Sequence, residues 1–404
     1  MRLRAIFAVS LGLVAWSTAR AADRKIPDSS KIRGFNYQSA PTLGHTEHWL
    51  LYDPAETERD MDFARRLNLN QARVFLSYTA WSRDKTAFHK NLVHLVRACQ
   101  QRGIGVMPAL QYPREWSQDK ASWPNAREYI ADLVNTIGNG KEPGLVFWDA
   151  HNEPGKARIE FARYVAGVFR ELDQVTPVII GSTVESEMEA TGSDMVDVLC
   201  FHDYSSNRAQ IRANIERARQ YAAKQGKQVM NGEIGCIARA NPYDVILEEY
   251  SKANMGWYIW ELMITHQWGR VHGVFYPDGT VRDPSIVAAV LGFFRNRGRE
   301  IQPEVPDAEG RVTRAVAENK QWLADPNPSW EAGLDMAERS ANLLEAAQLI
   351  AMHDPPTRTL DLMRAAQPNI PALRTLVQKW TEILEPWQLP VGDYQRTRLF
   401  GWIR

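Results

Sequence analysis

Short apolar runs alternate with amphipathic stretches from residue 32 to about residue 297. The apolar runs have the length of strands and predict eight of them, at residues 33–37, 71–76, 104–110, 145–149, 177–181, 196–202, 228–233 and 257–261. The stretches between them carry apolar residues at helical spacing and predict helices at residues 56–67, 85–102, 125–137, 157–172, 208–224 and 243–253. Such alternation is typical of a parallel α/β fold.

Eight similar strands with regular helical returns predict a closed (β/α)8 TIM barrel. An open, doubly wound sheet would show the same alternation of strand and helix. However, no glycine-rich phosphate-binding loop follows the first predicted strand, and the eight units are nearly equal. We therefore favour the closed barrel and expect residues 22–300 to form it.

The pattern changes beyond residue 300. Gln302-Pro303 and Val305-Pro306 make a linker-like break, and helical periodicity follows at residues 309–324, 330–352 and 370–384 with little strand signal. We expect residues 301–404 to form an all-helical C-terminal appendage. Helices in tandem usually pack on their host domain and stabilise it, and a separate binding role stays open.

The first 21 residues have the layout of a secretory signal peptide. Arg2 and Arg4 precede an apolar stretch at residues 5–16, and Ala19-Arg20-Ala21 offers a small-x-small cleavage site. A membrane anchor is the alternative, but this stretch is shorter than the roughly 20 residues that span a bilayer. We expect a mature protein that begins near Ala22, has no membrane span and is secreted or periplasmic.

Composition excludes some classes of partner. Lysine plus arginine equals aspartate plus glutamate at 48 each, so no overall field attracts nucleic acid or an anionic membrane. The three cysteines, Cys99, Cys200 and Cys236, are too few and too scattered for a disulfide framework or a zinc site. Cys200 and Cys236 are able to pair only if their strands are neighbours. We expect no metal and no other cofactor, and the oligomeric state is open.

Residues of catalytic type fall at the carboxyl ends of the predicted strands, where a TIM barrel builds its active site. Glu153 follows the fourth predicted strand and Glu233 ends the seventh. Four further residues are expected on the same face of the barrel: Arg73, His202, Tyr204 and Trp260. Each of these residue types is common in packing or in ion pairs, so the prediction rests on their joint placement. Because cleavage of a glycosidic bond requires two opposed carboxyl groups, we predict a sugar-cleaving enzyme.

Asn152-Glu153-Pro154 and Gly232-Glu233-Ile234-Gly235 resemble the paired signatures of the clan A glycoside hydrolases. The remaining spacing is similar to family 5, the cellulase and mannanase type, over residues 30–297. This resemblance implies a retaining mechanism with Glu153 as acid/base and Glu233 as nucleophile. It also implies that Asn152 binds the 2-hydroxyl of the sugar, that Arg73 and Tyr204 hold Glu233, that His202 lines the site, and that Trp260 is the platform beneath the sugar.

The charge of the neighbouring residues assigns a role to each of the two carboxyl groups, independently of the resemblance. The Arg73 cation and the Tyr204 hydroxyl favour an ionised neighbour, which suits Glu233 as the nucleophile. The acid must keep its proton, which suits Glu153 if Trp148 and other aromatic rings shield it and Glu233 lies near. A retaining pair is expected to lie about 5–5.5 Å apart.

The substrate is less well defined. Many family 5 members carry a histidine after the third strand, where this chain has Gln111, so the floor of the site differs. Candidate sugar contacts on the loops above the strands are Tyr37, His45, His48, Trp49, Tyr78, Trp81, Trp116, Trp123 and Trp268. These residues suit either successive sugars of a chain or a walled pocket for a terminal sugar. A β-linked glucan or mannan type oligo- or polysaccharide is the first expectation.

Two other functions use the same barrel. A transglycosylase that remodels cell-surface glycan has the same residues and differs only in whether water or a sugar accepts the glycosyl unit. A non-catalytic glycan-binding barrel usually lacks one carboxylate, whereas this chain keeps both Glu153 and Glu233.

Overall fold

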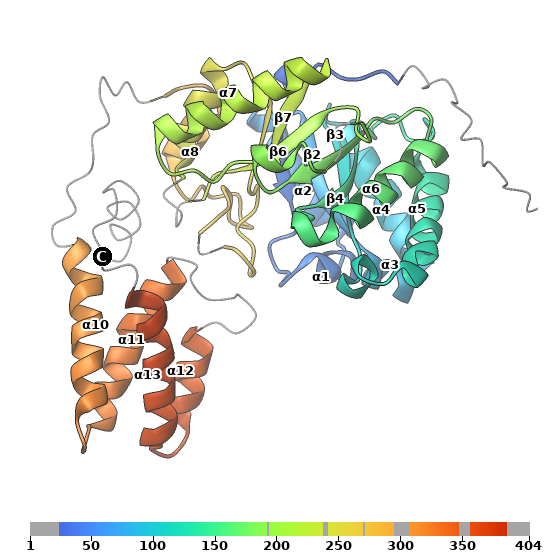
Figure 1. The fold of residues 1–404 in the computed structure, drawn as a ribbon. Coiled ribbons are helices and arrows are strands. Elements are labelled where there is room, and N and C mark those ends of the chain that lie inside the picture. Colours follow the sequence, from blue (N-terminus) through green and yellow to red (C-terminus); the bar gives the residue numbers. More distant parts are fainter. Residues whose placement is uncertain are drawn as a thin grey trace, which may run out of the picture.

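The computed structural model describes residues 24–191, 194–236, 241–269, 271–294, 308–346 and 356–385. These residues form a barrel and a group of C-terminal helices (Figure 1). The predicted signal peptide, residues 1–21, lies outside the described residues. Within the described ranges, no helix combines the length and the apolar character that a membrane crossing needs.

Eight parallel strands close into a barrel in sequence order, because β1 pairs with both β2 and β8. The strands are β1 (Arg33–Tyr37), β2 (Gln71–Ser77), β3 (Gly105–Gln111), β4 (Trp148–Asn152), β5 (Val178–Ser182), β6 (Leu199–His202), β7 (Val229–Ile234) and β8 (Trp257–Ile259). The predicted TIM barrel is confirmed. β4 begins later than predicted because the chain before it pairs only through a single bridge between Val106 and Leu145.

Helices surround the barrel: α2 (Pro54–Arg66), α4 (Lys85–Gln100), α5 (Trp123–Ile137), α6 (Gly155–Leu172), α7 (Arg208–Gln225), α8 (Tyr243–Lys252) and α9 (Pro284–Val290). All six predicted barrel helices are present with shifted ends. α2 starts early because the Asp53 side chain accepts from the N–H groups of Ala55 and Glu56, and Pro54 occupies the first turn. Two short helices in the loops after β1 and β2 were not predicted: α1 (His45–Leu50) and α3 (Tyr78–Arg83).

Side chains inside the barrel lie in layers. Along β2, Gln71, Arg73 and Phe75 point inward, because alternate strand residues face the same side. The lowest layer is an apolar floor that includes Met107, Phe147, Ile179, Cys200, Met230 and Tyr258. No disulfide joins Cys200 to Cys236, so the pairing considered from the sequence is absent. The Arg73, His202 and Glu233 side chains lie above this floor, toward the carboxyl ends of the strands.

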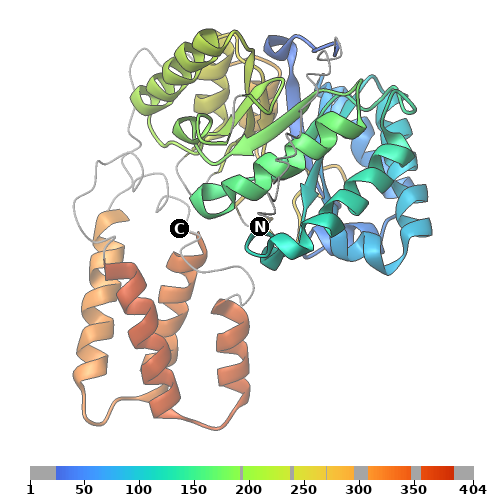
Figure 2. The same ribbon diagram turned by 45° about the vertical axis from the view of Figure 1, so that its right-hand side comes forward.

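The C-terminal helices pack on one another (Figure 2). They are α10 (Ala308–Ala324), α11 (Trp330–Ala346), α12 (Pro356–Ala365) and α13 (Ile370–Leu384), with a shared core that includes Val312, Trp322, Leu344, Leu373 and Trp380. The predicted helix at 330–352 corresponds to α11 as far as Ala346, and residues 347–355 lie outside the described residues; α12 was not predicted. The domain boundary at residue 300 and a stabilising role for these helices stay predictions.

Close packing between β1 and β8 gives a test of the barrel. A methyl group added at Gly34 would lie 2.2 Å from the buried ring of Tyr258, whose hydroxyl donates to Gln71. Gly34→Ala should therefore destabilise the protein by on the order of 1–3 kcal/mol. Gly44→Ala is the control, since its methyl group would meet only Gln267, at 3.8 Å. Equal melting temperatures for the two variants would contradict this packing.

Candidate active site

Arg73 lies at the centre of the barrel, with none of its side chain exposed. Its Nε and Nη2 donate to Asp149 Oδ2 at 2.9 and 2.7 Å. Nη1 donates to Asn36 Oδ1 at 2.9 Å and to Glu233 Oε1 at 2.7 Å, and Nη2 also donates to Asn152 Oδ1 at 2.6 Å. Every N–H group of the guanidinium thus has an acceptor, and the side chain is fixed between β1, β2, β4 and β7.

The charges around Arg73 do not cancel. Burial alone would lower the pKa of Arg73, but the carboxylates of Asp149 and Glu233 outweigh burial and raise it, so the guanidinium stays charged. With both carboxylates ionised, the group carries one positive and two negative charges, hence a net charge of −1. Such a centre favours a positive charge that develops on a bound substrate.

Glu233 lies on β7, and three groups orient it. Oε1 accepts from Arg73, Oε2 accepts from the Tyr204 hydroxyl at 3.0 Å, and the backbone N–H donates to Asn231 Oδ1 at 2.8 Å. The side chain is only 8% exposed. Both contacts that the sequence predicted for Glu233 are therefore present.

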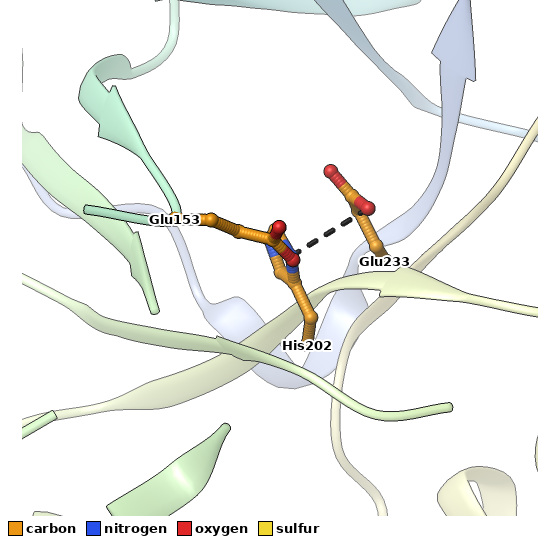
Figure 3. Close-up of side chains that lie close together, drawn as sticks. All are labelled: Glu153, His202 and Glu233. Atoms are coloured by element: carbon orange, nitrogen blue, oxygen red, sulfur yellow. Dashed lines mark hydrogen bonds and ion pairs between the residues drawn. The ribbon is translucent and has the colours of Figure 1, made fainter. Parts of the chain in front are cut away.

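Glu153 follows β4 in a left-handed backbone conformation, with φ of 43°. This conformation costs a non-glycine residue about 1–3 kcal/mol and persists only where neighbours enforce it. Here the Glu153 N–H donates to the Gly181 carbonyl at 2.8 Å, and Arg158 donates to the carbonyls of Glu153 and Pro154. The turn directs the side chain toward Glu233 (Figure 3).

His202, at the end of β6, lies between the two glutamates (Figure 3). Its Nδ1 is 2.7 Å from Glu153 Oε1 and 3.5 Å from Glu233 Oε2, and these three side chains place ligand atoms within 4.8 Å of one another. A metal ion would accept such a spacing. However, the Arg73 cation already contacts Glu233 Oε1 at 2.7 Å and would repel a metal cation, so we interpret the cluster as a carboxylate pair bridged by an imidazole.

Trp260 follows β8 and packs against Phe75 and Ala109, with Tyr204 and Trp268 beside it. His45, in the first turn of α1, stacks on Phe75 with ring centroids 4.2 Å apart and meets Trp260 edge-on at 6.4 Å. Gln111 ends β3 and is partly exposed. The predicted site residues other than Tyr37 thus meet at the carboxyl end of the barrel.

Comparison with known proteins identifies the fold and the chemistry. Residues 30–265 match the family model Cellulase (glycosyl hydrolase family 5), which is more than half of the chain. The chain belongs to glycosyl hydrolase family 5. It is therefore a glycoside hydrolase. A search of curated proteins found no match for this family 5 enzyme.

Solved structures share its barrel. They include an exo-β-1,4-mannosidase from Opitutaceae bacterium strain TAV5, with 15% identity and a TM-score of 0.53 over 76% of this chain and 74% of that one. A variant of the GH5_18 enzyme from Streptomyces cattleya, in complex with Manβ1-4GlcNAc, shows 16% identity and a TM-score of 0.52 over 68% and 81%. An endoglucanase shows 15% identity and a TM-score of 0.51 over 64% and 96%.

Tyr37 is the exception among the predicted site residues of this family 5 enzyme. Its buried hydroxyl donates to Asp60 on α2 at 3.1 Å, because Tyr37 faces outward and the preceding residue, Asn36, takes the inward position. Tyr37 is therefore not a substrate contact. Trp148 also faces outward, where its indole N–H donates to Asp173 at 2.8 Å, so it does not shield Glu153 as expected.

Most of the loop aromatics predicted as sugar contacts belong to the core. Trp49, Trp81 and Trp116 are buried, and the indole N–H groups of the first two donate to the Phe75 carbonyl and to Asp132. His48 is buried as well and contacts Ser39. His45 and Trp268 instead lie beside Trp260.

The partners that hold the site together were not predicted from the sequence. Asp149 and Asn36 bind Arg73, and Asn36 Nδ2 also donates to the carbonyls of Gly232 and Ile259, at 3.0 and 3.2 Å. The signal for both was a polar residue within a run otherwise typical of a buried strand. Arg158, on α6, gave no such signal, because an arginine on a helix is usually a solvated residue.

Arg73 gives the first test of the site. Arg73→Lys keeps the charge but offers three donors instead of a planar fork of five, so Glu233 and Asn152 lose their fixed positions. We expect turnover to fall by roughly two orders of magnitude or more, the rate equivalent of about 3 kcal/mol. Arg97→Lys is the control, since Arg97 pairs with Glu142 on the outer surface. A folded Arg73→Lys enzyme with normal turnover would make Arg73 purely structural.

Glu261 gives a second test, through pH. It is 1% exposed, its Oε1 accepts from Thr265 Oγ1 at 2.9 Å, and burial raises its pKa from 4.5 to about 8. Between these two values the folded protein holds a proton that the unfolded chain has lost, so stability falls as pH rises, by up to about 1.4 kcal/mol per pH unit. Glu261→Gln should remove this slope.

The measurement is the free energy of unfolding of both proteins from pH 5 to pH 8. Other buried carboxyl groups, such as Asp60, contribute equally to both, so the difference between the two curves reports Glu261 alone. Parallel curves would show that Glu261 does not hold this proton.

Proposed function

We propose that this family 5 enzyme is a secreted, retaining β-glycosidase with Glu153 as acid/base and Glu233 as nucleophile. One observation carries the mechanism: oxygens of the two carboxyl groups lie within 4.8 Å of one another. Retaining enzymes place their carboxyl groups about 5–5.5 Å apart, whereas inverting enzymes leave roughly 6.5–9.5 Å for a water molecule. The layout of residues 1–21 supports export.

In the first step Glu233 attacks the anomeric carbon while Glu153 protonates the leaving oxygen. Arg73 and Tyr204 hold the two oxygens of Glu233 and so fix the direction of attack. In the second step Glu153, now a carboxylate, removes a proton from water, and the water oxygen displaces Glu233. The contact of 2.7 Å between His202 Nδ1 and Glu153 Oε1 holds the Glu153 carboxyl group in place for both steps.

The net negative centre stabilises the transition state of each step. As the bond to the anomeric carbon breaks, positive charge develops on the sugar ring, and the carboxylates of Glu233 and Asp149 favour that charge. Asn152 accepts from Arg73 through Oδ1, which orients its amide nitrogen to donate to the 2-hydroxyl of the sugar. Trp260 lies beneath the same sugar as an apolar platform.

A β-linked glucan or mannan type oligo- or polysaccharide is the proposed substrate. The solved structures with a similar barrel include a β-1,4-mannosidase and an endoglucanase, which supports testing both sugars. Purified protein should be screened against aryl β-glycosides and β-linked oligosaccharides, with product configuration followed by NMR. The first product should keep the β configuration, and an α product would overturn the retaining mechanism. Added acceptor sugars distinguish hydrolysis from transglycosylation.

The two glutamates predict different responses to substitution. Glu233→Gln should abolish turnover of every substrate, because no nucleophile remains. Glu153→Gln should lose least activity on aryl glycosides whose leaving group needs no proton, because only the second step then needs Glu153, and should lose most on oligosaccharides, where both steps need it. Steady-state rates on one activated and one natural substrate check this. Equal losses for both variants on the activated substrate would leave the two roles unsupported.

A further inference from the structure

The carboxylate pair has one covered side and one open side. Trp260 is 7% exposed and the Glu233 side chain 8%, whereas the Glu153 side chain is 35% exposed. Solvent therefore reaches the site past Glu153, and exposure falls toward the residues that would lie beneath the sugar. Among these three side chains, exposure is thus greatest at Glu153.

Two loops close the side of the site at Trp260. The loop after β8 is joined to the loop after β1 where the His266 N–H donates to the Ala40 carbonyl at 3.0 Å. The loop after β1 then continues into α1, which places His45 on Phe75 and against the edge of Trp260. Residues 40–45 and 266–268 together form this closed end beside the platform.

The chemistry of the acid fixes which end of a substrate meets the closed end. Glu153 must lie beside the leaving oxygen, so the leaving group extends through the open side. The non-reducing end of the sugar points the other way, toward His45 and Trp260. A second sugar attached at that end would meet the closed end.

The described surface also offers few platforms for a long chain. Sugar rings stack on exposed aromatic faces, and a cleft for several sugars needs a series of them. Among the described residues, the large apolar side chains that are well exposed include only two aromatic ones, Tyr276 and Phe293, and no tryptophan. A substrate held by a row of exposed indoles is therefore not favoured.

We propose that the site is a pocket for one non-reducing terminal sugar and that the enzyme is exo-acting, releasing a single monosaccharide in each cycle. The inference rests on the proposed function and narrows it. The bond between the anomeric carbon and the leaving oxygen breaks, and that oxygen takes the proton of Glu153. The anomeric carbon bonds to Glu233; the oxygen of water then bonds to that carbon as its bond to Glu233 breaks, and water gives its proton to Glu153.

Product patterns test this directly. β-1,4-linked manno- and gluco-oligosaccharides of increasing length, labelled at the reducing end, should each lose one unlabelled monosaccharide at a time, with the label on a chain one unit shorter. Short labelled products at the earliest times would show internal cleavage and overturn the inference while the proposed function stands. No cleavage of any aryl β-glycoside or oligosaccharide would instead remove the proposed function itself.

A blocked substrate tests the closed end. A methyl group on the 4-hydroxyl of the terminal sugar should slow the wild-type enzyme by roughly tenfold or more. His45→Ala opens this end and should reduce that discrimination, whereas Leu50→Ala, at an exposed position of the same helix, should leave it unchanged. Equal wild-type rates on blocked and unblocked substrates, or unchanged discrimination in His45→Ala, would overturn the closed end.

Discussion

The buried guanidinium of Arg73 is the interaction on which the rest of the site depends. A charge inside a barrel is costly unless every donor finds an acceptor, and here Asn36, Asp149, Asn152 and Glu233 supply acceptors for all five N–H groups. These partners come from three other strands, so the geometry of the nucleophile is set by the closure of the barrel. The same contacts leave an excess negative charge, which is the electrostatic requirement for glycosidic cleavage.

Glu153, the proposed acid, is positioned by a different means. Its place depends on a strained backbone turn, which the Gly181 carbonyl on β5 and the Arg158 side chain on α6 hold. The turn leaves the Glu153 carboxyl group more exposed than that of Glu233, so a leaving group or water is able to reach it. His202 then links the two carboxyl groups, one fixed by charge and the other by backbone conformation.

The sequence predicted the barrel and the carboxylate pair because both depend on short-range patterns. Strand and helix periodicity is local, and Glu153 and Glu233 follow strands whose carboxyl ends must meet in any such barrel. Orientation about a strand was harder to predict, since a shift of one residue exchanges the two faces. That is why Tyr37 was misplaced while Asn36 was overlooked. The loop tryptophans were misassigned for a related reason: burial of Trp49 and Trp81 depends on helices α1 and α3, which the sequence pattern did not predict.

Bond cleavage and substrate length are thus controlled by separate parts of the molecule. The layer around Arg73 is enclosed by strands on all sides, and almost any change there disturbs the positions of Glu233 and Asn152. The closed end is formed by loop backbone and by His45 stacked on Phe75. The hydrogen bond that joins its two loops, between His266 and Ala40, does not involve the carboxylates. A loop is able to change length without moving the strand that it follows. On this barrel, therefore, a change in loop length is able to alter the number of sugars that fit beyond Trp260 without moving the charged residues around Arg73.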